Sequence, residues 1–438
     1  MSFKRPAVHN TTTEANTAKA GSHLKRRRLF QGAIAAGGLA AAGIGGMQLA
    51  GAQETEDVTA QATHPGLLHT QADFDRMKQK VDAGLEPWLS GWNKLIANGH
   101  AQSTWAARPT ATIIRGGDGQ NYPQLYNDIH AAYQNALRWR VSGSTAHRDK
   151  AVEILNGWSS TLETVTGNAD RFLAAGIYGY QFCAAADIVR GVSGFNLGAF
   201  QDMMTSIFLP MNNSFLTNHN DASITNYWAN WDLCNMASKL AIGLICDDNA
   251  IRDQAIDYFW NGEGNGSIEN AIPFVYSGGL AQWQESGRDQ GHAIMGIGLM
   301  ATIMEMAWNQ GIDLYGANNN AFAKAAEYVA RYNSGSDVPY TKYSWGTGQN
   351  CAYSEQTVIG SGGRGQVRPV WEMVFHHYTS RKSIAMPNVA NIAGANSPEG
   401  GGGDYGTTSG GFDTLGFGTL AHVRLTWDEM PDNQTPLG

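Results

Sequence analysis

A short run near the middle of the chain holds its densest group of chemically capable side chains. It reads Gln282-Trp283-Gln284-Glu285-Ser286-Gly287-Arg288-Asp289-Gln290-Gly291-His292. On an α-helix, Glu285, Arg288 and His292 (i, i+3, i+7) would fall within about 60° of one another. The spacing predicts an acid, a permanent cation and a titratable base on one helix face, which suits binding of an anion and proton transfer beside it. The alternative is a buried salt-bridge network between helices, although burying ionised groups is costly unless they are fully paired.

A second group combines amides with aromatic rings. It reads Asn226-Tyr227-Trp228-Ala229-Asn230-Trp231-Asp232. Asn226 and Asn230 are four residues apart, so a helix would present both amides on one face, with Trp228 and Trp231 beside them. Amide NH₂ groups donate to a carboxylate without adding a competing base, and tryptophan faces stack on sugar rings. The alternative is a pair of helix caps with core tryptophans.

Several single residues are further candidates. Tyr353 follows the Gly-rich run Trp345-Gly346-Thr347-Gly348, where a phenol could donate a proton at a cleft rim or simply pack. The segment 398–412 is Gly-rich and contains Tyr405; it is either a flexible linker or an ordered loop over a site. His219 is a lone histidine and more often structural, although it could reach the site. Arginines that could bind acidic sugars are Arg138, Arg140, Arg171, Arg364 and Arg368.

The elements that position these residues are predicted to be helices, because apolar residues recur at three and four and strand alternation is hard to find. The clearest runs are Tyr126/Ile129/Tyr133/Leu137, Ala151/Ile154/Leu155/Trp158, Phe200/Met203/Met204/Ile207 and Leu233/Met236/Leu240/Leu244. Loops are expected at 117–119, at Asn212-Asn213 and at 262–266. Helices joined by short loops without heptads indicate an all-α fold of stacked antiparallel helix pairs.

Two helical segments, 174–179 and 291–301, are rich in Gly and Ala. Glycine costs about 1 kcal/mol per helix position relative to alanine. Its repeated use therefore predicts that other groups approach these backbones closely, as in an inner ring of helices around an axis.

The first 52 residues read as an export signal. Lys25-Arg26-Arg27-Arg28 precedes a weakly apolar Gly/Ala stretch and Ala50-Gly51-Ala52, a small-x-small cleavage site. Adjacent arginines and low hydrophobicity favour the twin-arginine route, and Gln53 rather than Cys after the site predicts a protein free of a lipid anchor. We therefore expect a single domain over 53–438 in the periplasm or medium.

Composition and net charge restrict the classes of molecule that the protein could bind. The chain has 438 residues, of which 42% are hydrophobic and 16% charged, which excludes a coiled coil, bulk disorder and a multi-span membrane protein. Removing the seven basic residues and one acid of 1–52 leaves 23 Lys and Arg against 37 Asp and Glu, a net charge of −14. That balance argues against nucleic acid or an anionic membrane as partner once the signal is removed. The sequence indicates no oligomeric state.

No motif calls for a cofactor or a metal. The sequence has no HExxH, P-loop or GxSxG, and no Asp, Asn and His cluster at metal spacing. The four cysteines sit singly, and Cys183 and Cys234 lie in helical runs, where we expect small core residues rather than a disulfide.

At these residues the chain resembles the alginate-lyase-like family of polysaccharide lyases. The resemblance rests on 64–70 (His-Pro-Gly-Leu-Leu-His-Thr), on 226–232 and on 284–292, and it covers most of the chain after the signal. Within the family, the chain is most similar to lyases of β-1,4-linked polyglucuronate, also called glucuronan or cellouronate. The resemblance implies an (α/α) toroid and cleavage of 1,4-linked uronates by β-elimination. One departure concerns a histidine that periplasmic alginate lyases carry just before the Tyr-Trp pair: Ser223-Ile224-Thr225-Asn226 stands there, so that residue is not transferred.

The chemistry of a uronate then suggests roles. The C5 proton is weakly acidic until the adjacent carboxylate is neutralised, so elimination needs donors on that group, a base at C5 and an acid at O4. We expect Asn226 and Arg288 on the carboxylate with Asn230 assisting, and His292 as base. Tyr353 would be the acid, unless one residue serves both roles in a syn elimination. Glu285 would orient Arg288 or His292, and the expected binding residues are Tyr227, Trp228, Trp231, Arg138 and Tyr405.

Two other classes of protein fit the same residues. A glycoside hydrolase would use two carboxylates, chosen among Glu285, Asp289 and Asp232, at a separation of about 5 to 9 Å. A non-catalytic protein that binds acidic sugars would keep the tryptophans and arginines and release no product.

Overall fold

The computed structural model describes residues 61–345, 354–401, 411–426, 429 and 436–437. Val58–Gly438 forms one compact unit. The expected export segment, 1–52, lies outside the described residues. Within those ranges, every helix is too short or too polar to cross a bilayer.

The predicted all-α fold is confirmed. Its helices are α1 (Gln71–Asp82), α2 (Trp88–Ile96), α3 (Pro123–Ser142), α4 (Thr145–Ser159), α5 (Arg171–Leu173), α6 (Gly179–Ile188), α7 (Leu197–Met203), α8 (Leu209–Asn218), α9 (Ala229–Ile245), α10 (Asn249–Asn261), α11 (Ile268–Ala271), α12 (Gln290–Asn309), α13 (Ala317–Asn333), α14 (Trp371–His376), α15 (Pro387–Asn396) and α16 (Gly418–Ala421). Consecutive helices pair through short loops, as in α3 with α4 and α9 with α10, which is the arrangement expected of an (α/α) toroid.

Short strands, which the sequence analysis did not predict, form two-stranded sheets beside the helices. Strand β1 (Thr112–Arg115) pairs parallel with β2 (Thr164–Gly167). Strands β3 (Phe274–Tyr276) and β4 (Leu280–Gln282) are antiparallel, as are β5 (Tyr343–Trp345) and β6 (Ser354–Gln356). At three or four residues each, they are too short for an alternating pattern to stand out.

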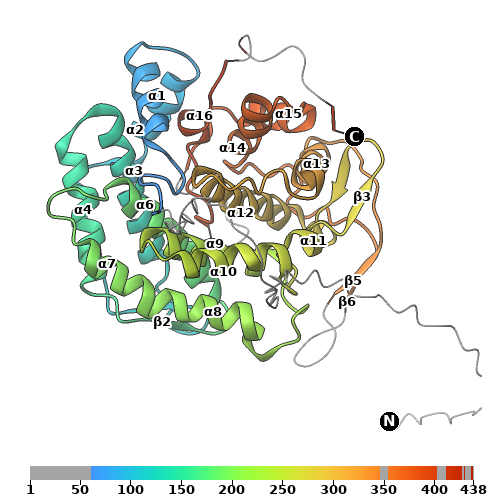
Figure 1. Ribbon diagram of the computed structural model, residues 1–438, viewed down its shortest axis with the longest axis horizontal. Coiled ribbons are helices and arrows are strands. Elements are labelled where there is room, and N and C mark those ends of the chain that lie inside the picture. The colour runs from blue at the N-terminus through green and yellow to red at the C-terminus, as the bar shows by residue number, and fades with distance from the viewer. Residues whose placement is uncertain (1–60, 346–353, 402–410, 427–428, 430–435, 438) are drawn as a thin grey trace, which may run out of the picture. The chain divides into compact units, whose positions relative to one another are not determined.

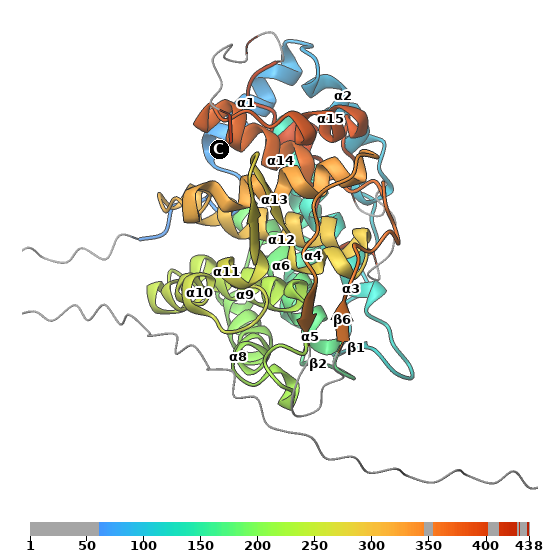
Figure 2. The ribbon, with the colours of Figure 1, turned by 90° about the vertical axis from the view of Figure 1, so that its right-hand side faces the viewer.

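Helix α9 lies at the centre of the packing. It contacts α6, α8, α10 and α12, and Figure 1 shows α9 and α12 side by side. In Figure 2, α14 and α15 lie next to α13. Helix α15 contacts α13, and α14 contacts α15. The predicted apolar runs supply this core: Leu137, Trp158, Phe200 and Leu233 are fully buried, each on a predicted helix.

The glycines of the Ala/Gly-rich segments mark close helix contacts, as predicted. Gly176 lies in a π-helical turn, Ala174–Tyr178, that leads into α6. A Cβ on Gly176 would stand 2.4 Å from Cys234 Sγ, and one on Gly179 would stand 2.1 Å from Ser238 Oγ. Both partners belong to α9, so these glycines allow the two helices to meet. Cys183 and Cys234 are buried free thiols, also as expected.

The expected loop at Asn212-Asn213 was wrong, because both residues lie inside α8. Asn212 is fully buried. Its amide donates to Asn235 Oδ1 at 2.9 Å and its Oδ1 accepts from Ser238 Oγ at 2.8 Å. These bonds to α9 satisfy the side chain and let the helix continue through a residue that often ends one.

The C-terminal residues 411–418 pack into the interior. The Gln181 amide donates to the Phe412 carbonyl at 2.8 Å, and the Tyr180 hydroxyl donates to the Asp413 carbonyl at 3.0 Å. Arg368 and Asp413 form an ion pair in which both side chains are almost completely buried. The Phe412 ring stacks on Tyr126 with centroids 4.1 Å apart. This part of the Gly-rich tail is therefore an ordered, packed segment; residues 402–410, with Tyr405, lie outside the described residues.

Candidate active site

A cavity of about 320 Å³ opens where three helix N-termini meet. Tyr122 precedes α3, Asn230 and Trp231 lie in the first turn of α9, and His292 lies in the first turn of α12. The lining residues are Arg115, Gln120, Tyr122, Asp170, Leu173, Asn230, Trp231, Arg288, His292 and Met295. Helix N-termini carry partial positive charge, so this arrangement favours an anion.

The first turn of α9 is capped by side chains from another part of the chain. Trp228, which precedes the helix, makes no side-chain capping bond. Instead, the Ala229 N–H donates to Gln284 Oε1 at 3.0 Å and the Asn230 N–H donates to Glu285 Oε1 at 2.8 Å. These bonds join the two motifs predicted from the sequence.

Glu285 is completely buried beneath Arg288. Burial raises the pKa of the Glu285 carboxyl above its ordinary value, although Arg288, His292 and the Asn230 N–H act in the opposite direction. Its Oε2 accepts from the guanidinium nitrogen Nη1 of Arg288 at 3.1 Å. Of the two residues that Glu285 was expected to orient, Arg288 and His292, it is hydrogen-bonded to Arg288.

Arg288 is held on several sides and still reaches the cavity. The same guanidinium nitrogen lies 3.4 Å from Asn230 Oδ1, and the guanidinium carbon lies 5.3 Å from the centre of the Trp228 ring. The side chain keeps 25% exposure. A permanent cation fixed at the edge of a cavity is suited to a carboxylate ligand.

His292 is bonded to Asp289 rather than to Glu285. Its Nδ1 lies 2.7 Å from Asp289 Oδ2, and its backbone N–H donates to Asp289 Oδ1 at 2.8 Å. Burial opposes ionisation of Asp289, but the hydrogen bonds from His292 and the charge of Arg288 outweigh it, so the pKa of this carboxyl lies below its ordinary value. The ring borders the cavity with 14% of its side chain exposed.

Both helix-based placements of the motifs were wrong. Residues 284–287 form a 3-10 turn, and Asp289 has an extended backbone (φ −165°, ψ 164°) before α12 begins. Glu285, Arg288 and His292 are thus gathered by a bend rather than along one helix face. Asn226 lies in a turn before α9, so it does not share a helix face with Asn230, and it is absent from the residues that line the cavity.

The aromatic residues of the second motif form a cluster with one edge at the cavity. The rings of Tyr227 and Trp231 have centroids 4.6 Å apart, and Trp231 stacks on Phe215. The Tyr227 hydroxyl accepts from the Asn220 side-chain amide, whose Oδ1 accepts from Arg171. Trp231 lines the cavity, whereas Tyr227 packs on Trp231 and Trp228 lies beside Arg288.

Arg138 lies apart from this group. It is near the C-terminal end of α3, 16 residues from Tyr122, which corresponds to about 24 Å along a helix. Its guanidinium donates to the Ala101 carbonyl at 2.7 Å and to Gln102 Oε1 at 3.2 Å. The structure therefore gives no support for Arg138 as a binding residue. Tyr353 and Tyr405 fall outside the described residues.

The sequence analysis missed a second cation in the cavity. Arg115 ends β1, and its guanidinium donates to the Tyr178 hydroxyl at 3.2 Å. The guanidinium carbon lies 5.0 Å and 5.5 Å from the ring centres of Tyr122 and Tyr178. A charged residue at the end of the short run Thr112-Ile113-Ile114, just before a Gly-Gly turn, was the signal available for it.

His219 is structural in this fold. Its Nε2 lies 2.8 Å from Asp232 Oδ1, which also accepts from the Tyr258 hydroxyl at 2.9 Å. The second oxygen of Asp232 accepts from the Gly266 N–H at 3.1 Å. The fully buried pair fixes the loop that leads into α9.

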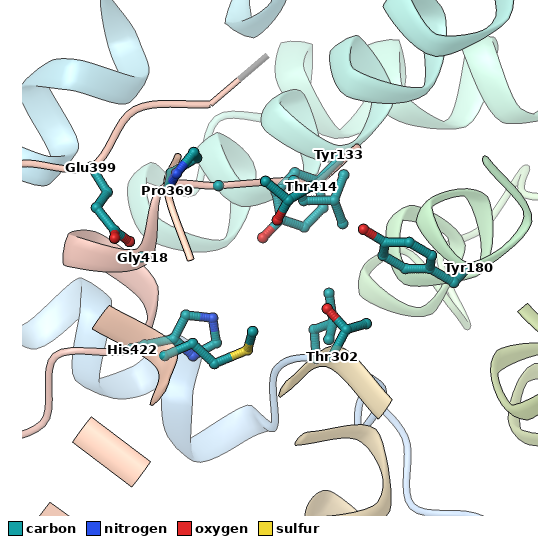
Figure 3. A pocket seen from close by; sticks show the side chains of 12 residues that line it. Tyr133, Tyr180, Thr302, Pro369, Glu399, Thr414, Gly418 and His422 are labelled. Atoms are coloured by element: carbon teal, nitrogen blue, oxygen red, sulfur yellow. The ribbon is translucent and has the colours of Figure 1, made fainter. Parts of the chain in front are cut away.

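Other hollows fit a uronate less well. One, of about 550 Å³, has Glu269 as the one charged side chain among the described residues that line it, and a carboxylate repels an acidic sugar. A cavity of about 20 Å³ between Tyr133, Tyr180, Thr414 and Glu399 is shown in Figure 3 and has room for about one water molecule. In the described part of the chain, no three His, Cys, Asp or Glu side chains gather as metal ligands.

Comparisons with known proteins give the family. The family model described as alginate lyase matches residues 101–338, more than half of the chain. No curated protein matches the sequence. Among solved structures, a histidine variant of alginate lyase A1-III in its apo form aligns with 12% identity over 82% of this chain and 97% of its own, with a TM-score of 0.53.

Two further structures are similar. The crystal structure of alginate lyase A1-III from Sphingomonas species A1 aligns with 12% identity over 82% of this chain and 98% of its own, with a TM-score of 0.51. An alginate lyase from Bacteroides ovatus aligns with 14% identity over 62% of this chain and 84% of its own, with a TM-score of 0.46. The shared fold and the family match lead to one assignment: the chain belongs to the alginate lyase family and is an all-α polysaccharide lyase.

Proposed function

We propose that this protein cleaves a 1,4-linked polyuronate by β-elimination, with β-1,4-glucuronan as the favoured polymer and alginate as the alternative. The observation that carries the proposal is the meeting of Arg288 and His292 at one cavity, each held by its own carboxylate. Membership of the alginate lyase family and the likeness of 64–70, 226–232 and 284–292 to glucuronan lyases support it.

In this proposal Arg288 binds the carboxylate of the uronate that is attacked. Neutralising that group stabilises the negative charge that develops when the C5 proton leaves. Asn230 helps hold Arg288, Arg115 supplies a second positive charge across the cavity, and the ring of Trp231 offers a face for sugar stacking. Asn226 remains a proposed carboxylate donor from its turn.

His292 takes the C5 proton on Nε2. The electron pair of the C5–H bond then forms the C4=C5 double bond, and the C4–O4 bond breaks. O4 leaves on the neighbouring sugar and takes a proton from Tyr353, the proposed acid. One product carries an unsaturated uronate at its non-reducing end, and the other carries a new reducing end.

The structure disfavours the hydrolase alternative. Glu285 and Asp232 are fully buried, and both oxygens of each already accept hydrogen bonds. Neither can reach a glycosidic oxygen or activate a water in the cavity. Asp289 has more exposure, at 26%, but its oxygens are bonded to His292.

The test is ultraviolet absorbance of purified protein with glucuronan, polymannuronate and polyguluronate offered separately. The expected result is rising absorbance from the conjugated C4=C5 uronate, fastest with glucuronan. New reducing ends without absorbance would indicate hydrolysis and overturn the proposal. Binding without any product would indicate a non-catalytic protein.

We also propose export through the N-terminal signal. The test is fractionation of cells that express the chain with Arg27 and Arg28, the adjacent arginines before Leu29-Phe30, intact or replaced by lysine.

A further inference from the structure

Asp289 engages His292 at two points. Its Oδ1 accepts from the His292 backbone N–H at 2.8 Å, which caps the N-terminus of α12, and its Oδ2 lies 2.7 Å from His292 Nδ1. Both the backbone and the ring of His292 are thus tied to one carboxylate. The Nε2 atom lies on the other edge of the ring, and the described residues offer it no hydrogen-bond partner.

A neighbouring loop holds the backbone around Asp289 in place. The Gln290 N–H donates to the Gly362 carbonyl at 2.7 Å, and the Gly360 N–H donates to the Ser286 carbonyl at 2.8 Å. A Cβ on Gly360 would stand 2.5 Å from the Arg288 carbonyl oxygen, so the loop can approach this closely only without a side chain there. The loop therefore fixes the backbone on both sides of Asp289.

Charges around Asp289 favour its ionised form. The Arg288 Nε lies 3.6 Å from Oδ2, and Glu285, the other nearby carboxylate, is paired with a different nitrogen of Arg288, Nη1, at 3.1 Å. An ionised carboxylate can only accept hydrogen bonds. The bond at Oδ2 consequently requires a proton on His292 Nδ1, and a neutral ring then carries no proton on Nε2.

We propose that Asp289 is a positioning residue that fixes His292 in the Nδ1–H tautomer, with a bare Nε2 directed toward the cavity as the proton acceptor. This rests on the proposed elimination. When Nε2 takes the C5 proton, the ring becomes an imidazolium whose second N–H remains bonded to the negative charge of Asp289. Glu285, by contrast, holds Arg288. The two carboxylates thus have different roles: Glu285 positions the cation that binds the anion, and Asp289 positions the base.

Asp289→Asn is the variant that tests this assignment. Asparagine is as good a helix N-cap as aspartate, so its Oδ1 can keep the bond to the His292 N–H. Its NH₂ group would donate to Nδ1 and shift the ring proton to Nε2, which removes the base. The matched control is Asp248→Asn, since Asp248 caps α10 through a 3.0 Å bond from the Ile251 N–H and does not line the cavity.

Steady-state kinetics and thermal unfolding together distinguish positioning from a structural role. We expect Asp289→Asn to lower kcat by roughly 10²- to 10⁴-fold, the range of general-base catalysis, with KM nearly unchanged. Asp248→Asn should match the wild type in kcat, and both variants should melt within a few degrees of it.

The tautomer can be read without any substrate. In protein labelled with ¹⁵N-histidine, long-range ¹H–¹⁵N spectra assign the protonated ring nitrogen, and the His292 signals are those lost in His292→Gln. We expect Nδ1–H in the wild type and Nε2–H in Asp289→Asn. An Nε2–H wild type, or an Asp289→Asn enzyme with wild-type kcat, would overturn the inference. If the wild type yields no unsaturated product, the proposed function fails, while the spectra still decide the role of Asp289.

Discussion

The Asn230 backbone N–H donates a 2.8 Å hydrogen bond to Glu285 Oε1, although 55 residues separate the two in sequence. The second oxygen of the same carboxylate holds Arg288. One buried group thus sets both the start of α9 and the position of the cation at the cavity. A substitution of Glu285 should therefore change both substrate binding and the free energy of unfolding.

Glu285→Gln should lower kcat/KM by roughly 10- to 100-fold, since a hydrogen bond to a charged group contributes about 1.5–3 kcal/mol. The amide can still accept from the Asn230 N–H, but its NH₂ group faces Arg288, donor against donor. Steady-state absorbance kinetics would measure the loss. An unchanged kcat/KM would show that Arg288 holds its position without this carboxylate.

The same variant tests the raised pKa of Glu285. Between the ordinary carboxyl value and the raised one, the unfolded chain has lost its proton and the folded chain has kept it. The free energy of unfolding of the wild type should therefore fall relative to Glu285→Gln as pH rises through that window, and be parallel outside it. Urea denaturation at a series of pH values provides the comparison; an opposite slope would mean that the carboxylate is stabilised by folding.

His292→Ala should abolish elimination and leave the fold intact. The imidazole is the proposed base, and its ring is hydrogen-bonded to Asp289, a carboxylate that keeps 26% exposure and can be solvated when the ring is removed. Product absorbance and thermal unfolding would be measured together. A variant that still forms unsaturated product at a rate near the wild type would eliminate His292 as the base.

Arginine-to-lysine substitutions should distinguish the arginines that line the cavity, Arg288 and Arg115, from Arg138 on α3. Arg288→Lys is expected to lower kcat/KM by roughly 10²- to 10³-fold, the scale of losing one preorganised donor, because an ammonium cannot reproduce the guanidinium fork. Arg115→Lys should raise KM more than it lowers kcat. Arg138→Lys is the matched control and should behave like the wild type; a loss there comparable to that of Arg288→Lys would restore Arg138 to the site.

Acid should destabilise the fold through buried histidines. Burial lowers the pKa of His69 to about 4 and that of His377 to about 4. The unfolded chain binds these protons near pH 6.5 and the folded chain does not, so stability is lost as pH falls from about 6.5 toward about 4. The slope should be about 1.4 kcal/mol per pH unit for each histidine, and His69→Gln should reduce it. Denaturation at a series of pH values would measure both slopes. If His69 were already charged in the folded state, the wild type and His69→Gln would lose stability with the same slope.

Sequence patterns predicted the helices well and the site in part. The apolar periodicity of α3, α4, α7 and α9 is local, so it can be read from the chain. The gathering of Glu285, Arg288 and His292 was predicted from a helix that does not exist; a bend at Asp289 brings them together instead. Arg115 could not be placed at the cavity, because only the pairing of β1 with β2 and the stacking on Tyr122 and Tyr178 bring it there. Contacts between residues so far apart in the sequence produce no periodic pattern of apolar residues from which they could be predicted.

The burial of 411–418 bears on when the chain can finish folding. Tyr180 and Gln181 find their partners at Asp413 and Phe412, more than 230 residues later, and Arg368 finds its counter-ion at Asp413. During synthesis these bonds cannot form until residues 412 and 413 have left the ribosome, and until then Asp413 cannot neutralise the charge of Arg368. A chain that stopped before residue 411 would stay open at its centre.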